Sequence, residues 1–219
     1  TEKHVLLLGS TKHKYAELEN SGALVYNLDT QETKLLLEGT KRLHGFQSGL
    51  GRVVGVNRAK QQIYMPAFAA QPSRSPPYHL YRVSLKSGIG KIHAKGKKST
   101  QDWFVSSDGS VLAREDYSKE KREHRVYSKV TGKWELIYAL KTDIPEISIS
   151  AISADSSKLL FVKNNGRDGV YSMRLADGDI EGPSFTRDDA DIEGLVLDID
   201  RKLVAIQYSG FLPDYQFTD

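Results

Sequence analysis

The stretch that decides the fold is Trp103-Phe104-Val105-Ser106-Ser107-Asp108-Gly109, in which an apolar run is followed at once by a Ser/Asp turn. Two later stretches have the same form: Ala151-Ile152-Ser153-Ala154-Asp155-Ser156-Ser157 and Leu195-Val196-Leu197-Asp198-Ile199-Asp200. Their aspartates Asp108, Asp155 and Asp200 are separated by 47 and 45 residues. A short apolar run that ends in such a turn is typical of a β-strand entering a hairpin. The chain therefore repeats one hairpin at a nearly constant interval.

A second marker, an apolar residue followed by tyrosine, repeats in phase with the first. It occurs at Val25-Tyr26, Leu80-Tyr81, Val126-Tyr127 and Val170-Tyr171, and the tyrosines are 55, 46 and 44 residues apart. The long first interval contains a proline-rich insertion, residues 66–77 (PAFAAQPSRSPP), and removing about ten of these residues restores the common period. A few short strands in each such repeat are typical of a β-propeller blade. A β-sandwich or barrel would also contain alternating strands, but it gives no reason for two markers to repeat in phase.

We therefore predict an all-β chain: a β-propeller segment of about four to five blades, each a three- to four-stranded antiparallel sheet. Apolar and polar residues alternate with the period of a strand at 134–140, 147–151 and 204–208. Only residues 12–18 have a pattern that could form a helical turn or two. We treat residues 1–219 as one propeller segment, with blades expected at about residues 4–39, 50–96, 100–141 and 147–186 and a partial blade at 190–219.

Composition excludes several classes of protein. The chain has 219 residues and no cysteine, which rules out disulfides, thiolate zinc sites and a cysteine nucleophile. Its net charge of +3 is too small for the basic field of a nucleic-acid-binding protein. No apolar run approaches the ~20 residues of a membrane span. We expect no nucleic-acid partner and no membrane span.

The chain carries no signal peptide and begins at Thr1, so it reads as a segment of a longer protein. The sequence does not distinguish a cytoplasmic from a periplasmic location, because a chain without cysteine tolerates both the reducing and the oxidising environment. Exposed sheet edges at the ends of such a segment are expected to fray or to pair between copies.

No catalytic motif is present, and we assign no catalytic, cofactor-binding or metal-binding residue. The string GFQSG at 45–49 lacks the spacing of the G-x-S-x-G nucleophile elbow, and no phosphate-binding glycine loop occurs. The six histidines are scattered, and His79 and His124 are expected to flank the tyrosine strands. The acidic stretch 188–194 lacks the alternating ligands of a calcium loop and is interpreted as a solvated connection between blades.

Two basic clusters and the proline-rich insertion are the remaining unusual features. The clusters span residues 86–98 and 119–125, and each is interpreted as a solvated loop or, alternatively, as a site for an acidic partner or a peptide carboxylate. Proline cannot donate a ladder hydrogen bond, so residues 66–77 are expected to leave the sheet. The insertion is either a tolerated surface loop or a lid or docking loop.

The repeat and its turns resemble the propellers of bacterial serine peptidases of the prolyl oligopeptidase family. The resemblance lies in RDDADIEGLVLD at 187–198 continuing to AIQY at 205–208, in NLDTQET at 27–33, and in GKWEL at 132–136. It covers most of the chain, but its motifs are of modest specificity because propellers converge on similar turns.

The resemblance implies a role in gating rather than in catalysis. In that family an α/β-hydrolase domain follows the propeller and supplies the Ser-Asp-His triad, and the propeller restricts entry to short or unstructured peptides. The implied partners are thus a hydrolase domain of the same parent chain and a peptide substrate; the parent would be a serine peptidase, while this segment would not itself be an enzyme. No stretch matches the acidic pair with which some relatives hold the substrate amino terminus. The alternative is a non-enzymatic interaction propeller of the Tol-type periplasmic kind, and a sugar-active propeller ranks last.

Overall fold

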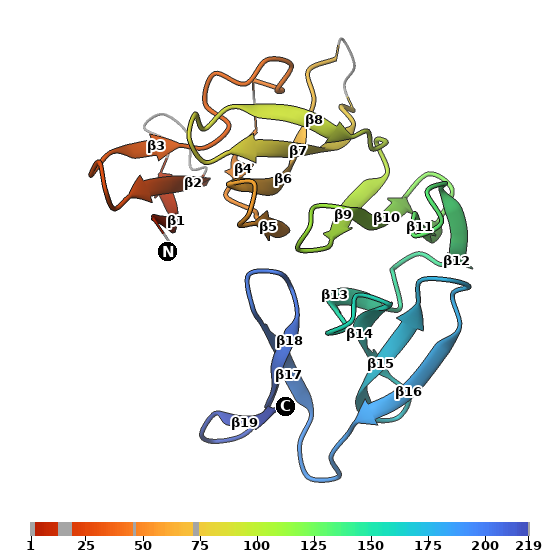
Figure 1. Cartoon of the computed structure of the whole chain (residues 1–219). Helices are drawn as coiled ribbons and strands as arrows, with labels where there is room; N and C mark the ends of the chain where they lie inside the picture. The colour runs from red at the N-terminus through yellow and green to blue at the C-terminus, as the bar shows by residue number, and fades with distance from the viewer. Residues whose placement is uncertain (1–2, 13–18, 46, 72–74, 219) are drawn as a thin grey trace. The chain divides into compact units, whose positions relative to one another are not determined.

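The computed structural model describes residues 3–12, 19–45, 47–71 and 75–218, which form nineteen strands and no helix (Figure 1). The predicted helical turn at 12–18 falls mostly on residues 13–18, which lie outside the described residues. Two compact units, Thr1–Ser110 and Val111–Asp219, are described in turn.

The first unit contains two complete sheets and the first strand of a third. The first sheet has the order β1-β2-β3, with β4 paired parallel to β2. The second sheet has the order β5-β6-β7-β8 and is antiparallel throughout. The strands of this unit are β1 (His4–Lys12), β2 (Glu19–Asn27), β3 (Thr33–Leu35), β4 (Gly49–Leu50), β5 (Gly55–Asn57), β6 (Gln62–Phe68), β7 (Tyr78–Ser84), β8 (Gly90–Ala94) and β9 (Thr100–Val105).

The second unit continues the third sheet, in the order β12-β11-β10-β9, and adds a four-stranded and a three-stranded sheet. The last two have the orders β13-β14-β15-β16 and β17-β18-β19, so neighbours in sequence are neighbours in each sheet. Its strands are β10 (Val111–Ser118), β11 (Glu123–Ser128), β12 (Glu135–Lys141), β13 (Ser148–Ile152), β14 (Lys158–Asn164), β15 (Asp168–Arg174), β16 (Ile180–Phe185), β17 (Ile192–Leu197), β18 (Leu203–Tyr208) and β19 (Asp214–Phe217).

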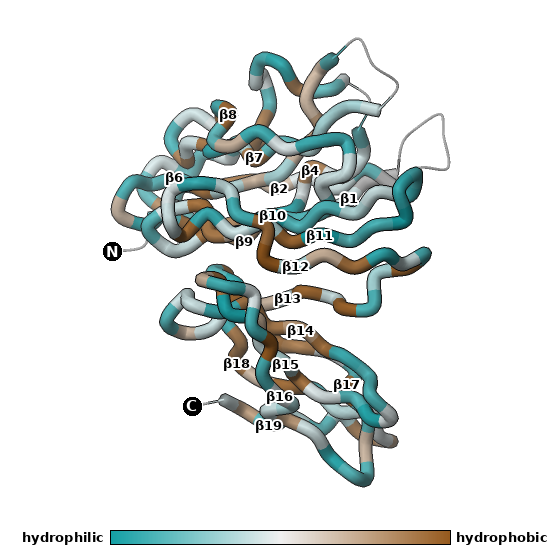
Figure 2. Tube along the Cα trace, turned by 90° about the vertical axis from the view of Figure 1, so that its right-hand side faces the viewer, coloured by the Kyte–Doolittle hydropathy of each residue, from teal (hydrophilic) through white to brown (hydrophobic). Residues whose placement is uncertain are grey.

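These five small sheets confirm the predicted fold class, an all-β β-propeller segment whose blades have three to four strands. Burial follows the strand period: in β11 every second side chain is buried, whereas the last strand of each sheet in the second unit is largely exposed. Figure 2 shows the apolar residues concentrated in strands and the polar ones in the connections. In the first unit, Val25 of the first sheet lies in one buried cluster with Met65 and Tyr81 of the second sheet.

The three Ser/Asp turns each join the first two strands of a sheet. In the turn between β13 and β14, the Asp155 carboxylate accepts hydrogen bonds from the hydroxyls of Ser153 (2.6 Å) and Ser157 (2.7 Å) and from the backbone N–H of Ser157 (3.0 Å). These bonds, that of Ser153 first, hold the pKa of Asp155 well below its usual range. In the turn between β17 and β18 the accepting carboxylate is instead Asp198, which binds the backbone N–H of Asp200 at 2.9 Å. The marker residue and the turn acceptor are therefore two positions apart in this copy.

The proline-rich insertion begins later than predicted, because β6 runs through Pro66 to Phe68 and pairs with β7. The Tyr64 carbonyl accepts from the Val54 N–H (2.9 Å), so the backbone N–H and C=O of Tyr64 point toward β5. Every second residue of a strand points its backbone groups to the same neighbour, so those of Pro66 point toward β5 as well. Strand β5 pairs with β6 no further than Gly55 opposite Tyr64. The missing N–H of Pro66 therefore faces a position where the neighbouring strand has already ended, which is where a sheet tolerates proline. Within the rest of the insertion, residues 72–74 lie outside the described residues.

Candidate functional site

The candidate site lies in the first unit, where the β6–β7 hairpin passes into the proline-rich loop. A hollow of about 640 Å³ opens there. We call it the basic groove, and its lining residues are Arg42, Ala69, Ala70, Gln71, Ser75, Pro77, His79, Ile92, Lys95, Gly96 and Lys98. The structure thus brings together two features that the sequence predicted separately, the proline-rich loop and part of the 86–98 basic cluster.

One wall of the groove is built by the segment before β4 lying along the end of β6. Beyond Pro66, the side-chain amide of Gln47 makes the hydrogen bonds that a neighbouring strand would otherwise make. Its oxygen accepts from the Phe68 N–H (2.9 Å), and its nitrogen donates to the Phe68 carbonyl (3.2 Å). The Ala70 N–H donates to the Arg42 carbonyl (2.8 Å), which also accepts from the Tyr81 hydroxyl (3.1 Å). Arg42 is therefore fixed at the groove by its backbone.

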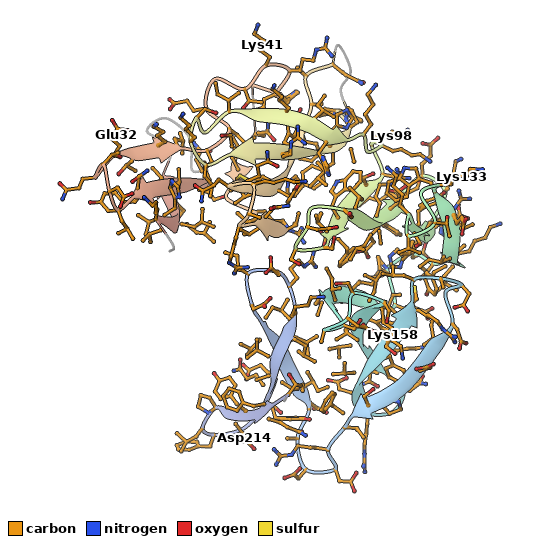
Figure 3. The ribbon with its side chains drawn as sticks, viewed as in Figure 1. Glu32, Lys41, Lys98, Lys133, Lys158 and Asp214 are labelled. Carbon is orange, nitrogen blue, oxygen red and sulfur yellow. The ribbon has the colours of Figure 1, made fainter. Side chains whose placement is uncertain are left out.

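The opposite wall is the segment that follows β8. The Tyr78 N–H donates to the Lys97 carbonyl (3.1 Å), and the Gly96 N–H donates to Nδ1 of His79 (3.0 Å). Gly96 is packed so tightly that a Cβ there would lie 2.1 Å from the Tyr78 carbonyl oxygen. Lys98 follows at the end of this segment, beyond β8 (Figure 3).

All the charged side chains among the described residues that line the groove are positive. Arg42, Lys95 and Lys98 line it together with His79, and no aspartate or glutamate is among the described residues that line it. His79 is buried, and burial, with a smaller contribution from the Lys95 charge, lowers its pKa. The imidazole is therefore neutral at pH 7 and accepts a hydrogen bond through Nδ1, which places its proton on Nε2.

A second hollow, of about 530 Å³, adjoins the basic groove, because Lys98 lines both. We call it the aromatic hollow, since Phe68 and Tyr78 form part of its wall with ring centroids 4.7 Å apart. Its other lining residues are Gln47, Ser48, Gly49, Thr100 and Gln101. As in the basic groove, the described part of its lining includes no carboxylate.

The expectation that His79 and His124 flank the tyrosine strands is wrong, because both lie inside β7 and β11. Each is buried and hydrogen bonded there: His79 to Gly96, and His124 to the Glu115 carboxylate at 2.7 Å. One ring nitrogen of each histidine finds a partner within the sheet or beside it, whereas Nδ1 of His124 is buried without a hydrogen bond.

The second basic cluster forms no comparable site. Arg122 makes a two-point ion pair with Asp143, and Arg125 pairs with Glu123 at 2.7 Å. The hollow beside them, about 690 Å³, includes the Asp143 carboxylate in its lining, where it neutralises Arg122, although Lys121 and Lys141 line the hollow too. In the acidic stretch, Asp189 pairs with Arg187 at 2.8 Å and Asp188 with Arg167. Within the described ranges, no three potential ligands gather into a metal site.

Sequence reasoning assigned no site residue and missed Arg42 and Gln47. Neither stands in a recognisable motif, and their positions depend on the pairing of residues 42–44 with 68–70, which are distant in sequence. Lys95 and Lys98 belong to the predicted basic cluster, while Lys86, Lys91 and Lys97 of that cluster do not line the groove. Only the fold separates the lysines that meet from those that do not.

His79 should make the stability of the protein depend on pH. Its folded-state pKa is lowered, so between that value and about 6.5 the unfolded chain binds more protons and stability falls as the pH falls. We expect the free energy of unfolding of wild type to decrease from pH 7.5 to pH 5, and His79→Gln to show a smaller decrease. Guanidinium unfolding curves over this range measure both. Parallel curves for the two proteins would show that His79 does not carry the effect.

The described part of the chain contains no helix long and apolar enough to cross a bilayer. The sequence matches no protein-family model and no curated protein.

Solved structures show where the fold recurs. The chain resembles TolB from Acinetobacter baumannii (14% identity, TM-score 0.52, covering 90% of this chain and 45% of that one) and a prolyl endopeptidase (13% identity, TM-score 0.54, covering 93% and 30%). It also resembles the tricorn protease (16% identity, TM-score 0.50, covering 94% and 19%). The chain thus spans less than half the length of each. It has a β-propeller fold that is shared, at low identity, with propeller domains of peptidases and with TolB.

Proposed function

We propose that this chain is the non-catalytic propeller part of a serine peptidase of the prolyl oligopeptidase family. In this role it admits short or unstructured peptides to an α/β-hydrolase domain located elsewhere in the parent chain. The chemistry of bond cleavage then belongs to that domain, and the propeller contributes selection.

The basic groove is the observation that carries the proposal. It is a concave surface of peptide-binding size with a few charged groups, and a second hollow with two aromatic side chains shares Lys98 with it; a concave surface with a few placed polar groups is typical of a ligand site. The fold supports the same reading, since it is shared with a prolyl endopeptidase in whose catalysis and specificity inter-domain dynamics has a role. The sequence offers no nucleophile elbow of its own.

The proposal is tested by sequencing the gene on both sides of these 219 codons and then assaying peptide cleavage by the encoded protein and by the isolated chain. We expect the same reading frame to encode an α/β-hydrolase domain with a G-x-S-x-G elbow. The full parent protein should then cleave unstructured peptides, and the isolated 219-residue chain should cleave none. A complete frame without a hydrolase domain would refute the proposal.

An interaction propeller of the Tol type is the second candidate, favoured by the resemblance to TolB. It predicts capture of a folded partner rather than an unstructured peptide. Binding that survives when the partner is folded and disappears when it is unfolded, in a frame that ends after further blades, would support it.

A further inference from the structure

Two cations of the basic groove, Arg42 and Lys95, have no counter-charge among the described residues that line it. Arg42 and Lys95 are exposed and pair with no described carboxylate, and none lines the groove. Like charges that converge in this way repel one another unless an anion is bound. In the hollow beside Arg122, by contrast, the Asp143 carboxylate lines the hollow and neutralises Arg122, although Lys121 and Lys141 line it too.

The backbone that carries these cations is held in place before any ligand arrives. The Arg42 carbonyl is held by two hydrogen bonds, and the Lys95 segment is held through Gly96 to the buried His79. A site whose backbone is fixed in advance loses less conformational entropy on binding. The arrangement therefore favours binding of an anion at a defined place rather than loose surface attraction.

The neighbouring hollow indicates what kind of molecule carries the anion. The groove alone, at about 640 Å³, is much larger than a single carboxylate, and it shares the lining residue Lys98 with the aromatic hollow. An extended peptide can place a terminal carboxylate between the cations and an apolar side chain against Phe68 and Tyr78. Every unmodified peptide has such a carboxylate, whatever its sequence.

We propose that the basic groove binds the C-terminal carboxylate of unstructured peptides, with Arg42 and Lys95 as its cationic partners. This inference rests on the proposed function and adds the direction in which a peptide binds, namely with its carboxyl end in the groove. Charge-assisted hydrogen bonds from Arg and Lys to a carboxylate are the interaction that would provide the selectivity.

The test measures fluorescence anisotropy of the whole 219-residue chain with a dye-labelled, disordered decapeptide, made once with a free C-terminal carboxylate and once as the C-terminal amide. We expect the acid to bind about tenfold more tightly than the amide, and the difference to shrink as salt rises. Lys95→Glu should weaken binding of the acid by about tenfold and leave the amide within about twofold.

Lys91→Glu is the matched control, because Lys91 is also exposed, lies in β8, and does not line the groove. It changes the net charge equally and should alter binding of either peptide by less than about twofold. Lys95→Gln, with thermal unfolding of every variant, separates loss of binding from loss of folding.

Equal affinities for the acid and the amide would overturn the inference and leave the proposed function standing. Equal effects of Lys95→Glu and Lys91→Glu would also overturn it, because the attraction would then be general. Binding of neither peptide would overturn both this inference and the proposed selection of peptides.

Discussion

Replacing Asp116 with alanine should lower the free energy of unfolding by about 3–5 kcal/mol. Asp116 accepts two hydrogen bonds from the Arg114 guanidinium, from Nε at 2.9 Å and from Nη2 at 3.0 Å. Both side chains are about 5% exposed, and they lie on the same face of β10. Alanine would leave a permanently charged guanidinium buried without this carboxylate.

The aromatic contacts of Arg114 contribute less than that loss. Its guanidinium carbon lies 4.9 Å from the ring centroids of both Tyr127 and Trp134. A cation over an aromatic ring contributes about 0.5–2 kcal/mol, less than the cost of a buried unpaired charge.

Two controls separate burial from pairing. The double replacement Arg114→Met with Asp116→Leu removes both charges and should be less destabilising than Asp116→Ala by at least about 1 kcal/mol. Asp143→Ala breaks the exposed pair with Arg122 and should cost less than about 1 kcal/mol. Urea unfolding monitored by tryptophan fluorescence gives all three values. A similar cost for Asp116→Ala and Asp143→Ala would contradict the argument from burial.

The sequence predicted the β-propeller segment because its signals are local. The turn at Asp155 is formed by serines two residues away on either side, and the strand alternation around Val126 is visible without any partner strand. Such features repeat with the period of the blade, so the repeat itself reveals the fold.

The candidate site could not be predicted in the same way, because its parts are assembled by long-range pairing. Arg42 reaches the groove through a bond to Ala70, and Gln47 completes the edge of β6 beside Phe68. The sequence alone predicts that Pro66 leaves the sheet, but whether a strand accepts a proline depends on where the neighbouring strand ends, and β5 ends before it reaches Pro66. Residue type predicts such positions only when the partner is known.

Gly178→Ala should be the second strongly destabilising change, at about 3–4 kcal/mol. Gly178 lies in the turn between β15 and β16 with φ of +82°, a conformation that costs an alanine about 1–2 kcal/mol. An added Cβ would also lie 1.9 Å from the Ile137 carbonyl oxygen in β12. Because that atom belongs to the backbone of a neighbouring sheet, relief requires a shift of one sheet against the other.

Gly132→Ala separates these two contributions, because Gly132 has nearly the same φ, +87°, and nothing lies within 4 Å of its added Cβ. It should cost only the conformational part, about 1–2 kcal/mol, so the difference between the two variants in urea unfolding measures the contact with Ile137. Equal losses in the free energy of unfolding for the two variants would mean that β12 moves away from the added Cβ at little cost. A larger cost at Gly178 would instead show that the two sheets are held at a fixed separation, as close packing of backbone against backbone requires.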